Sequence, residues 1–143
     1  MPFDANLILM DGSVITTVDL DTPATSTTRD ATTGAVVLDL EGSGARGLAA
    51  VLILSELADA ADAYTLTAFI EGSDVLAFTS DIHRLCSFDL LGTAGGVIVG
   101  SETPCTVVAR FATNERYIRI NATVSNTFGY ITALISPYPF ILL

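Results

Sequence analysis

Hydrophobic and polar residues alternate along several short stretches of this chain, and turn-forming residues separate the stretches. The alternation is clearest over residues 117–125, where the even-numbered residues are apolar and the odd-numbered ones are polar or aromatic. A period of two is typical of a β-strand with one buried face, because successive side chains point to opposite faces. Further strand-like runs cover residues 14–20, 64–70, 105–111 and 130–136. Short strands at this spacing predict an all-β fold, an antiparallel β-sandwich or barrel.

The runs at residues 117–125 and 130–136 are separated by a short segment that contains a glycine, residues 126–129. Two strand-like runs joined by such a segment are typical of a β-hairpin. We therefore expect residues 117–125 and 130–136 to pair with each other.

The remaining segments fit a single β-sandwich domain over residues 1–143, with a segment of residues 1–13 at its N-terminus. Residues 21–33 are polar and almost free of large apolar side chains, which predicts a loop or an arm that is ordered only on a neighbour. Residues 55–63 are rich in alanine and acidic, as in a loop or one or two helical turns. The tail, residues 137–143, is extended by its prolines and ends in apolar residues, so we expect it to dock on another surface.

Composition narrows the possible partners. The formal net charge is −10, and the six basic residues are all arginine, which argues against a nucleic-acid partner because phosphate binding needs a basic face. Charged residues make up 15% of the chain, against a usual value of about 25%, so more apolar surface is present than one small core absorbs. We expect the excess to be covered by a partner or by oligomerisation. The longest apolar run, residues 48–54, is far too short to span a membrane, and no secretory signal precedes the first strand.

One glycine-rich segment matches a cofactor-binding pattern. Residues 42–47 read Gly-Ser-Gly-Ala-Arg-Gly after a strand-like stretch, which is the G-x-G-x-x-G spacing of dinucleotide-binding folds. Three features disfavour a dinucleotide site: Glu41 would lie beside the phosphates, residues 48–54 are apolar on every side, and the rest of the chain reads as strands. We interpret the segment as a turn between two strands and expect no cofactor.

Catalytic and metal-binding chemistry has little support. Asp81, His83 and Cys86 are the residue types of a nucleophilic site, but on a strand His83 and Cys86 point to opposite faces. We interpret His83 as an edge residue beside a carboxylate. With two cysteines and one histidine, the chain offers too few soft ligands for a zinc site, and we expect both thiols to be free and mostly buried. No enzymatic activity is therefore expected.

Three of the six arginines gather in one region of this acidic chain. Arg110, Arg116 and Arg119 lie close together in sequence, and on a strand Arg119 would share an outer, polar face with Tyr117 and Asn121. Arginine forms bidentate bonds to carboxylates and is favoured at desolvated interfaces. Two interpretations stay open, intersubunit clamps and ordinary surface ion pairs.

The tail adds two aromatic residues to this candidate interface. Tyr138 and Phe140 lie in the extended segment that we expect to dock, and together with the three arginines and Tyr117 they form the predicted contact set.

The C-terminal third also resembles a known family. Residues 116–125 (Arg-Tyr-Ile-Arg-Ile-Asn-Ala-Thr-Val-Ser), followed by a glycine-containing turn and residues 130–134, resemble the closing hairpin of the small capsid cement proteins of the Bordetella podophage type. Residues 7–16 and 65–74 are similar to earlier segments of that family. The polar residues 21–33 and the proline-rich tail depart from the family pattern.

The resemblance implies a jelly-roll β-sandwich that assembles as a homotrimer around a local three-fold axis. It implies attachment to the major capsid protein on the outer surface of an icosahedral head built in the host cytoplasm, where the trimer would stabilise the shell by bridging capsomers. A carbohydrate- or receptor-binding β-sandwich module is the alternative. Such modules usually stack sugars on exposed aromatic rings, and this chain has no tryptophan and four tyrosines.

Overall fold

The computed structural model describes residues 7–15, 23–41, 45–54, 65–88, 97–99, 105–124 and 130–137. These residues contain nine β-strands and no α-helix. The strands are β1 (Ile8–Ile15), β2 (Leu38–Asp39), β3 (Ala45–Leu54), β4 (Thr65–Ser73), β5 (His83–Ser87), β6 (Val97–Val99), β7 (Cys105–Thr113), β8 (Tyr117–Val124) and β9 (Tyr130–Pro137).

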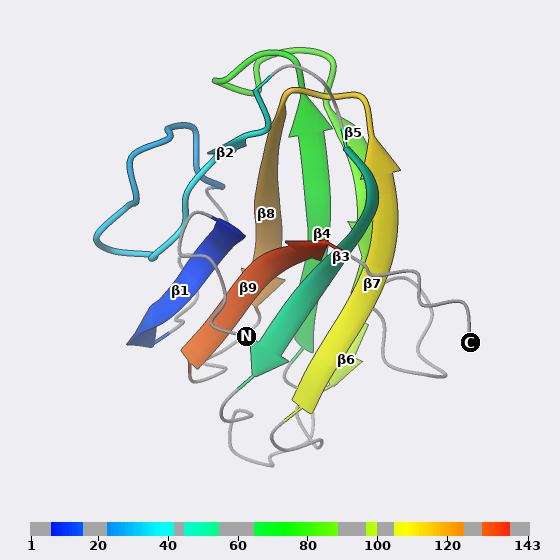
Figure 1. The fold of residues 1–143 in the computed structure, drawn as a ribbon. Coiled ribbons are helices and arrows are strands. Elements are labelled where there is room, and N and C mark those ends of the chain that lie inside the picture. The colour runs from blue at the N-terminus through cyan, green and yellow to red at the C-terminus, as the bar shows by residue number, and fades with distance from the viewer. Residues whose placement is uncertain are drawn as a thin grey trace, which may run out of the picture.

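The strands form two antiparallel sheets that face each other (Figure 1). Sheet A has the order β1-β9-β3-β7, and sheet B has the order β2-β8-β4-β5. The short strand β6 also pairs with β4, next to the positions where β5 pairs, so β5 and β6 lie in line along the same edge of β4. With these two counted as one, the fold has eight strands, and the chain crosses between the sheets in the order of a jelly roll. The predicted fold class is confirmed.

The core lies between the sheets and is filled by the inward-facing side chains of both. On β3 every second side chain from Ala50 to Leu54 is fully buried, and on β4 the same holds from Leu66 to Ile70. The alternation along β8 works as predicted, since Ile118, Ile120 and Ala122 are buried. The alternation of apolar and polar residues in the sequence thus identifies the side chains that fill the core between the two sheets.

The predicted strand positions agree with the structure over much of the chain. The runs at residues 64–70, 105–111, 117–125 and 130–136 correspond to β4, β7, β8 and β9. The predicted run at residues 14–20 is described only at its first two residues, which end β1.

The predicted start of the first strand at residue 14 is wrong, because the described part of the predicted N-terminal segment, residues 1–13, already contributes to β1. Residues 8–13 belong to β1, which pairs with β9 at the edge of sheet A. A glycine at position 12 has φ 66°, and the register of β1 shifts on either side of Asp11, so bulges hide the period of two along this strand.

The predicted hairpin between residues 117–125 and 130–136 is also wrong. β8 pairs with β2 and β4 in sheet B, whereas β9 pairs with β1 and β3 in sheet A. Each strand has one strongly apolar face, and a crossing between the sheets lets both faces enter the core from opposite sides.

The polar residues 21–33 were expected to form a loop or an arm ordered on a neighbour. Residues 23–33, the part that the structure describes, form a loop that folds on the chain itself. The Arg29 guanidinium donates to the carbonyls of Gly34 and Ile8, at 2.6 and 2.8 Å, and the Val37 amide donates to the Ser26 carbonyl. Hydrogen bonds to backbone groups fix this segment in the absence of large apolar side chains, a mechanism that composition alone does not show.

The glycine-rich segment precedes a strand. Residues 42–44 lie outside the described residues, and residues 45–47 already belong to β3. A dinucleotide site would need a helix after these glycines, whereas residues 45–54 form strand β3, so the structure disfavours such a site. Residues 55–63 and 138–143 also lie outside the described residues.

Candidate functional site

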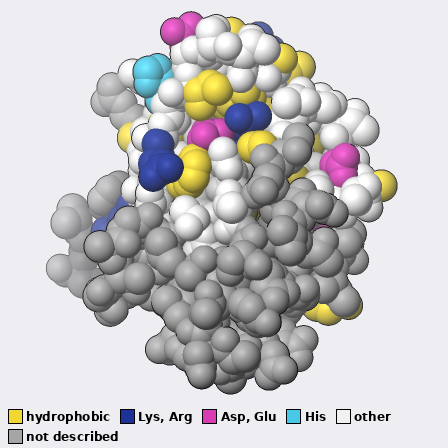
Figure 2. All heavy atoms as spheres, turned by 180° about the vertical axis from the view of Figure 1, so that it is seen from behind, with side chains coloured by type: hydrophobic (Ala, Val, Ile, Leu, Met, Phe, Trp, Pro, Cys, Tyr) yellow, Lys and Arg dark blue, Asp and Glu magenta, His cyan; other side chains and the backbone are white. Residues whose placement is uncertain are grey.

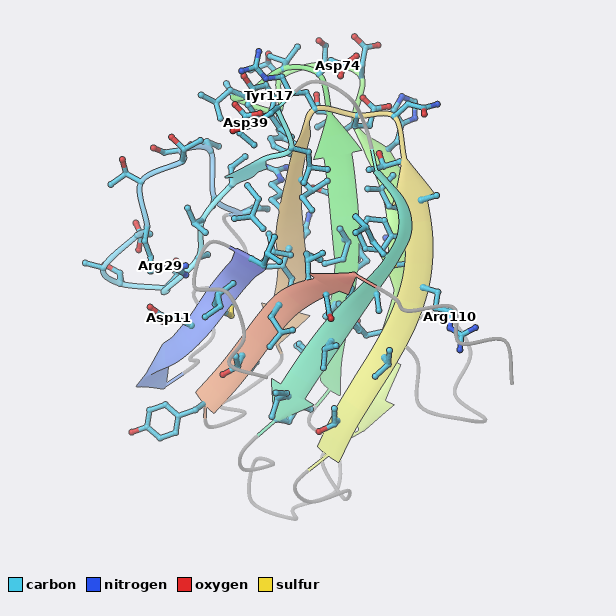
Figure 3. All side chains as sticks on the ribbon, in the orientation of Figure 1. Asp11, Arg29, Asp39, Asp74, Arg110 and Tyr117 are labelled. Atoms are coloured by element: carbon cyan, nitrogen blue, oxygen red, sulfur yellow. The ribbon has the colours of Figure 1, made fainter. Side chains whose placement is uncertain are left out.

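The predicted contact residues are divided between the two sheets. Arg116 precedes β8, and Tyr117 and Arg119 lie on it in sheet B, whereas Arg110 lies on β7 in sheet A. Figure 3 shows Tyr117 at one end of the sandwich and Arg110 on another side, pointing away from it. Tyr138 and Phe140 lie outside the described residues. The three arginines that are close in sequence therefore do not form one cluster.

Arg119 is buried within its own chain, with 7% of its surface exposed. Its Nε donates to Glu71 Oε2 at 2.9 Å, its Nη1 donates to the Ala24 carbonyl at 3.1 Å, and its guanidinium stacks 4.0 Å from the centre of the Phe78 ring. The amide of Asn121 donates to the other oxygen of Glu71 at 3.0 Å. Each buried side-chain nitrogen and oxygen atom of this cluster has a hydrogen-bond partner.

Arg119 thus shares the outward side of β8 with Asn121, as the alternation predicts, but its own chain buries it there. Its position on β8 points away from the core, and Ala24 and Phe78 cover its guanidinium there. Figure 2 views the molecule from this side, where acidic and basic side chains meet hydrophobic ones. The buried cluster of Glu71, Arg119 and Asn121 holds the loops that contain Ala24 and Phe78 to the sheet.

Arg116 matches the interpretation as an ordinary surface pair. Its guanidinium donates two hydrogen bonds to Asp39, from Nε at 3.0 Å and from Nη2 at 2.8 Å. These bonds lower the pKa of Asp39 and raise the pKa of Arg116. The guanidinium also lies 4.9 Å from the ring centre of Tyr117, and the Arg116 amide donates to Asp74 at 3.0 Å.

The loop between β4 and β5, residues 74–82, is held in a strained shape; we call it the 74–82 loop. Phe78 and Asp81 both have φ 50°, a left-handed conformation that costs a non-glycine residue about 1–3 kcal/mol. The hydroxyl of Ser73 donates to the Ser80 carbonyl at 2.9 Å, and the Phe78 ring lies against Arg119. With Phe78 buried as the anchor, the loop exposes two large apolar side chains, Leu76 at 37% and Ile82 at 43%.

A second apolar surface lies on the outer side of sheet A. Its outward positions on β3 and β7 are Ala49, Val51, Ile53, Thr106, Val108, Arg110 and Ala112, which we call the β3–β7 face; Ala49 among them is buried, with 4% of its surface exposed. Val51 lies beside Val108, which is 54% exposed, the largest value among the exposed large hydrophobic residues of the described chain. The outward positions of β3, β7 and β9 that the structure describes carry no acidic side chain.

Sequence reasoning missed both apolar surfaces. The signal for the β3–β7 face was the run at residues 48–54, which is apolar at successive positions and so leaves one apolar side outside a two-sheet core. The signal for the 74–82 loop was a pair of large apolar residues, Leu76 and Ile82, within a turn-like segment.

The residues that suggested nucleophilic chemistry lie on β5 or next to it. His83 lies at the start of the edge strand β5, with Nε2 3.7 Å from Glu115, so the neighbouring carboxylate is Glu115 and not the Asp81 that shares its face in the sequence pattern. Cys86 is a free thiol, and burial raises its pKa to about 11, which keeps it protonated near neutral pH. Across the described residues, no group of three or more histidine, cysteine or acidic side chains could hold a metal ion.

A polar hollow of about 260 Å³ opens inside the loop of residues 23–33. Its lining is formed by Pro23, Ala24, Thr25, Ser26, Thr28, Asp30, Thr32 and Thr33. The Asp30 carboxylate accepts the amides of Thr32 and Thr33 at 2.7 and 2.8 Å, and these bonds lower the pKa of Asp30. None of the described residues that line the hollow is aromatic.

Comparison with known proteins assigns this chain to no family. Neither the family models nor the curated proteins contain a match to this chain. The part of the chain that the structure describes holds no helix long and apolar enough to cross a membrane.

Proposed function

We propose that this chain is a structural protein of a virus particle, a cement protein that binds as a trimer to the outer surface of an icosahedral capsid. In this role it bridges neighbouring capsomers, which are built from the major capsid protein, and stabilises the shell. It carries out no catalysis and uses no cofactor or metal.

The observation that carries the proposal is the β3–β7 face. An exposed apolar sheet surface in a monomer marks a contact with another protein surface. Val108 stands 54% exposed at its centre, and the face lacks acidic side chains in a chain of net charge −10. Repeated over many symmetric copies, such apolar contacts add about 25 cal/mol for each Å² that they bury.

Two further features support a structural role. The jelly roll recurs in viral capsid proteins and lectins, which is an argument from fold analogy. The charged groups with the best geometry, Arg119 with Glu71 and Arg116 with Asp39, are paired within the chain and hold loops and strand ends together. The C-terminal resemblance to podophage cement proteins agrees with both features.

Electron microscopy of particles that carry the chain tests the proposal. Density for three jelly rolls over each local three-fold axis, outside the shell, is the expected result. A biochemical test uses heads stripped of the chain: adding it back should raise the temperature at which they release DNA. Density inside the shell, or stripped heads that neither bind the chain nor gain heat resistance, would refute the proposal.

The alternative, a carbohydrate-binding module, has one specific feature in its favour, the hydroxyl-lined hollow inside residues 23–33. Hydroxyl and carboxylate groups bind sugar hydroxyls, but sugar sites usually also stack a ring on an aromatic side chain. A glycan array separates the two functions. Micromolar binding that Asp30→Ala abolishes would favour the carbohydrate-binding module.

A further inference from the structure

The exposed large apolar side chains of the described residues occur at three places. Leu76 and Ile82 lie on the 74–82 loop, Val108 lies on the β3–β7 face, and Tyr130 lies at the start of β9. The first two places differ in form, because one is a projecting loop and the other is the flat side of a sheet. Figure 1 shows the loop between β4 and β5 at the upper end of the sandwich, while the outer side of sheet A faces the viewer.

We propose that the 74–82 loop of one copy docks on the β3–β7 face of the next copy, so that each chain contributes both halves of one head-to-tail contact. This inference rests on the proposed function, since it names the surfaces that join the copies of the trimer. The occupant of the β3–β7 face is therefore a second copy of this chain.

Charge argues for this pairing. The loop carries two exposed acidic side chains, Asp74 and Asp81, around its apolar residues. The β3–β7 face carries Arg110 and no acidic side chain. Two chains of net charge −10 repel each other wherever acidic surfaces meet, and the approach of an acidic loop to an acid-free face avoids that repulsion.

The shape of the loop argues for a binding role. Two left-handed non-glycine residues, Phe78 and Asp81, are strained in the isolated chain; Arg119 holds Phe78 in place, and the hydrogen bond from Ser73 to the Ser80 carbonyl ties down the loop next to Asp81. A loop fixed before association loses less conformational entropy when it binds. The same fixed shape keeps Leu76 and Ile82 in water, where they gain nothing until a partner covers them.

The symmetry of the assembly follows from the fact that the contact joins two different surfaces. A contact between two different surfaces of the same chain is heterologous, and it generates a closed ring when the rotation between copies closes. A ring of three has three identical contacts and leaves neither a free loop nor a free face.

Variants that damage one half of the contact test the inference. The loop variant is Leu76→Ser with Ile82→Ser, and the face variant is Val108→Asp. All three side chains are more than a third exposed, so both variants should fold. Tyr130→Ser, at an equally exposed position outside the contact, is the matched control. Circular dichroism checks folding, and light scattering after size exclusion measures mass in the absence of capsids.

The wild type and the control should have a mass of about 45 kDa, three times the 15.0 kDa of one chain. Each damaged variant alone should be a monomer. A mixture of the loop variant and the face variant should form dimers of twice the chain mass and no trimers, because one intact loop and one intact face remain. Damaged variants that stay trimeric, a mixture that stays monomeric, or a monomeric wild type would overturn the inference.

Capsid binding is measured separately with the same proteins. A wild-type monomer that still binds capsids would refute the head-to-tail contact and leave the cement function standing. A trimer with the expected mixing behaviour that binds no capsid would refute the cement function and leave the contact standing.

Discussion

Removing the guanidinium of Arg119 should destabilise the protein far more than removing that of Arg116. Arg119 donates one hydrogen bond to its carboxylate, at 2.9 Å, whereas Arg116 donates two to Asp39, at 3.0 and 2.8 Å, so geometry alone would favour the Arg116 pair. Burial separates them, because the side chains of Arg119 and Glu71 are 8% and 11% exposed, whereas those of Arg116 and Asp39 are 48% and 30% exposed.

The size of the loss in stability follows from the Glu71 carboxylate, which stays buried when the guanidinium is removed. Arg119→Met keeps much of the side-chain volume but leaves Glu71 buried without its cation, which costs about 3–5 kcal/mol. The variant also loses the hydrogen bond to Ala24 and the contact with Phe78, so the upper end of that range is expected. Arg116→Met leaves an exposed carboxylate that water solvates, and its effect should be much smaller.

Urea unfolding followed by circular dichroism measures both variants at equal protein concentration. With a slope of about 2 kcal/mol per M urea, a loss of 4 kcal/mol lowers the midpoint by about 2 M. Adding Glu71→Gln to Arg119→Met removes the stranded charge and keeps an oxygen for Asn121, so the double variant should be more stable than the single one. Equal midpoints for Arg119→Met and Arg116→Met, or no recovery in the double variant, would refute the reasoning.

Three further predictions concern the backbone, the surface pair and the thiol. Gly12→Ala should lower the free energy of unfolding by roughly 1–3 kcal/mol in urea titrations, since φ 66° disfavours a side chain and the added Cβ would collide with strand β9. The pKa of Asp39 is lowered by Arg116, so the stability that this pair provides is present above the ordinary value of 3.8 and is lost as pH falls through the lowered folded value. The midpoints of wild type and Asp39→Asn should therefore differ at pH 6 and converge under acid, and a pH-independent difference would contradict this. In a Cys105→Ser variant, Cys86 should react slowly with thiol reagents at pH 8 and rapidly in urea, because its pKa is raised to about 11; equal rates would show that the thiol is accessible.

The position of Arg119 shows how far the candidate site could be predicted. In the sequence, Arg116 and Arg119 stand three residues apart, the first just before the alternating run of residues 117–125 and the second within it, and no local pattern shows that only Arg119 is buried. The difference comes from Ala24 and Phe78, which are far away in sequence and cover one arginine only. A site built from such long-range contacts is invisible to a local pattern.

The sequence by itself determined where most described strands lie and which of their side chains enter the core. That information is local, because the period of two depends only on the pleat of each strand. Tertiary structure alone decided that β8 and β9 belong to different sheets and that the 74–82 loop is strained. Pairing partners and loop shapes depend on contacts between distant segments, whose free energies exist only after the two sheets have packed together.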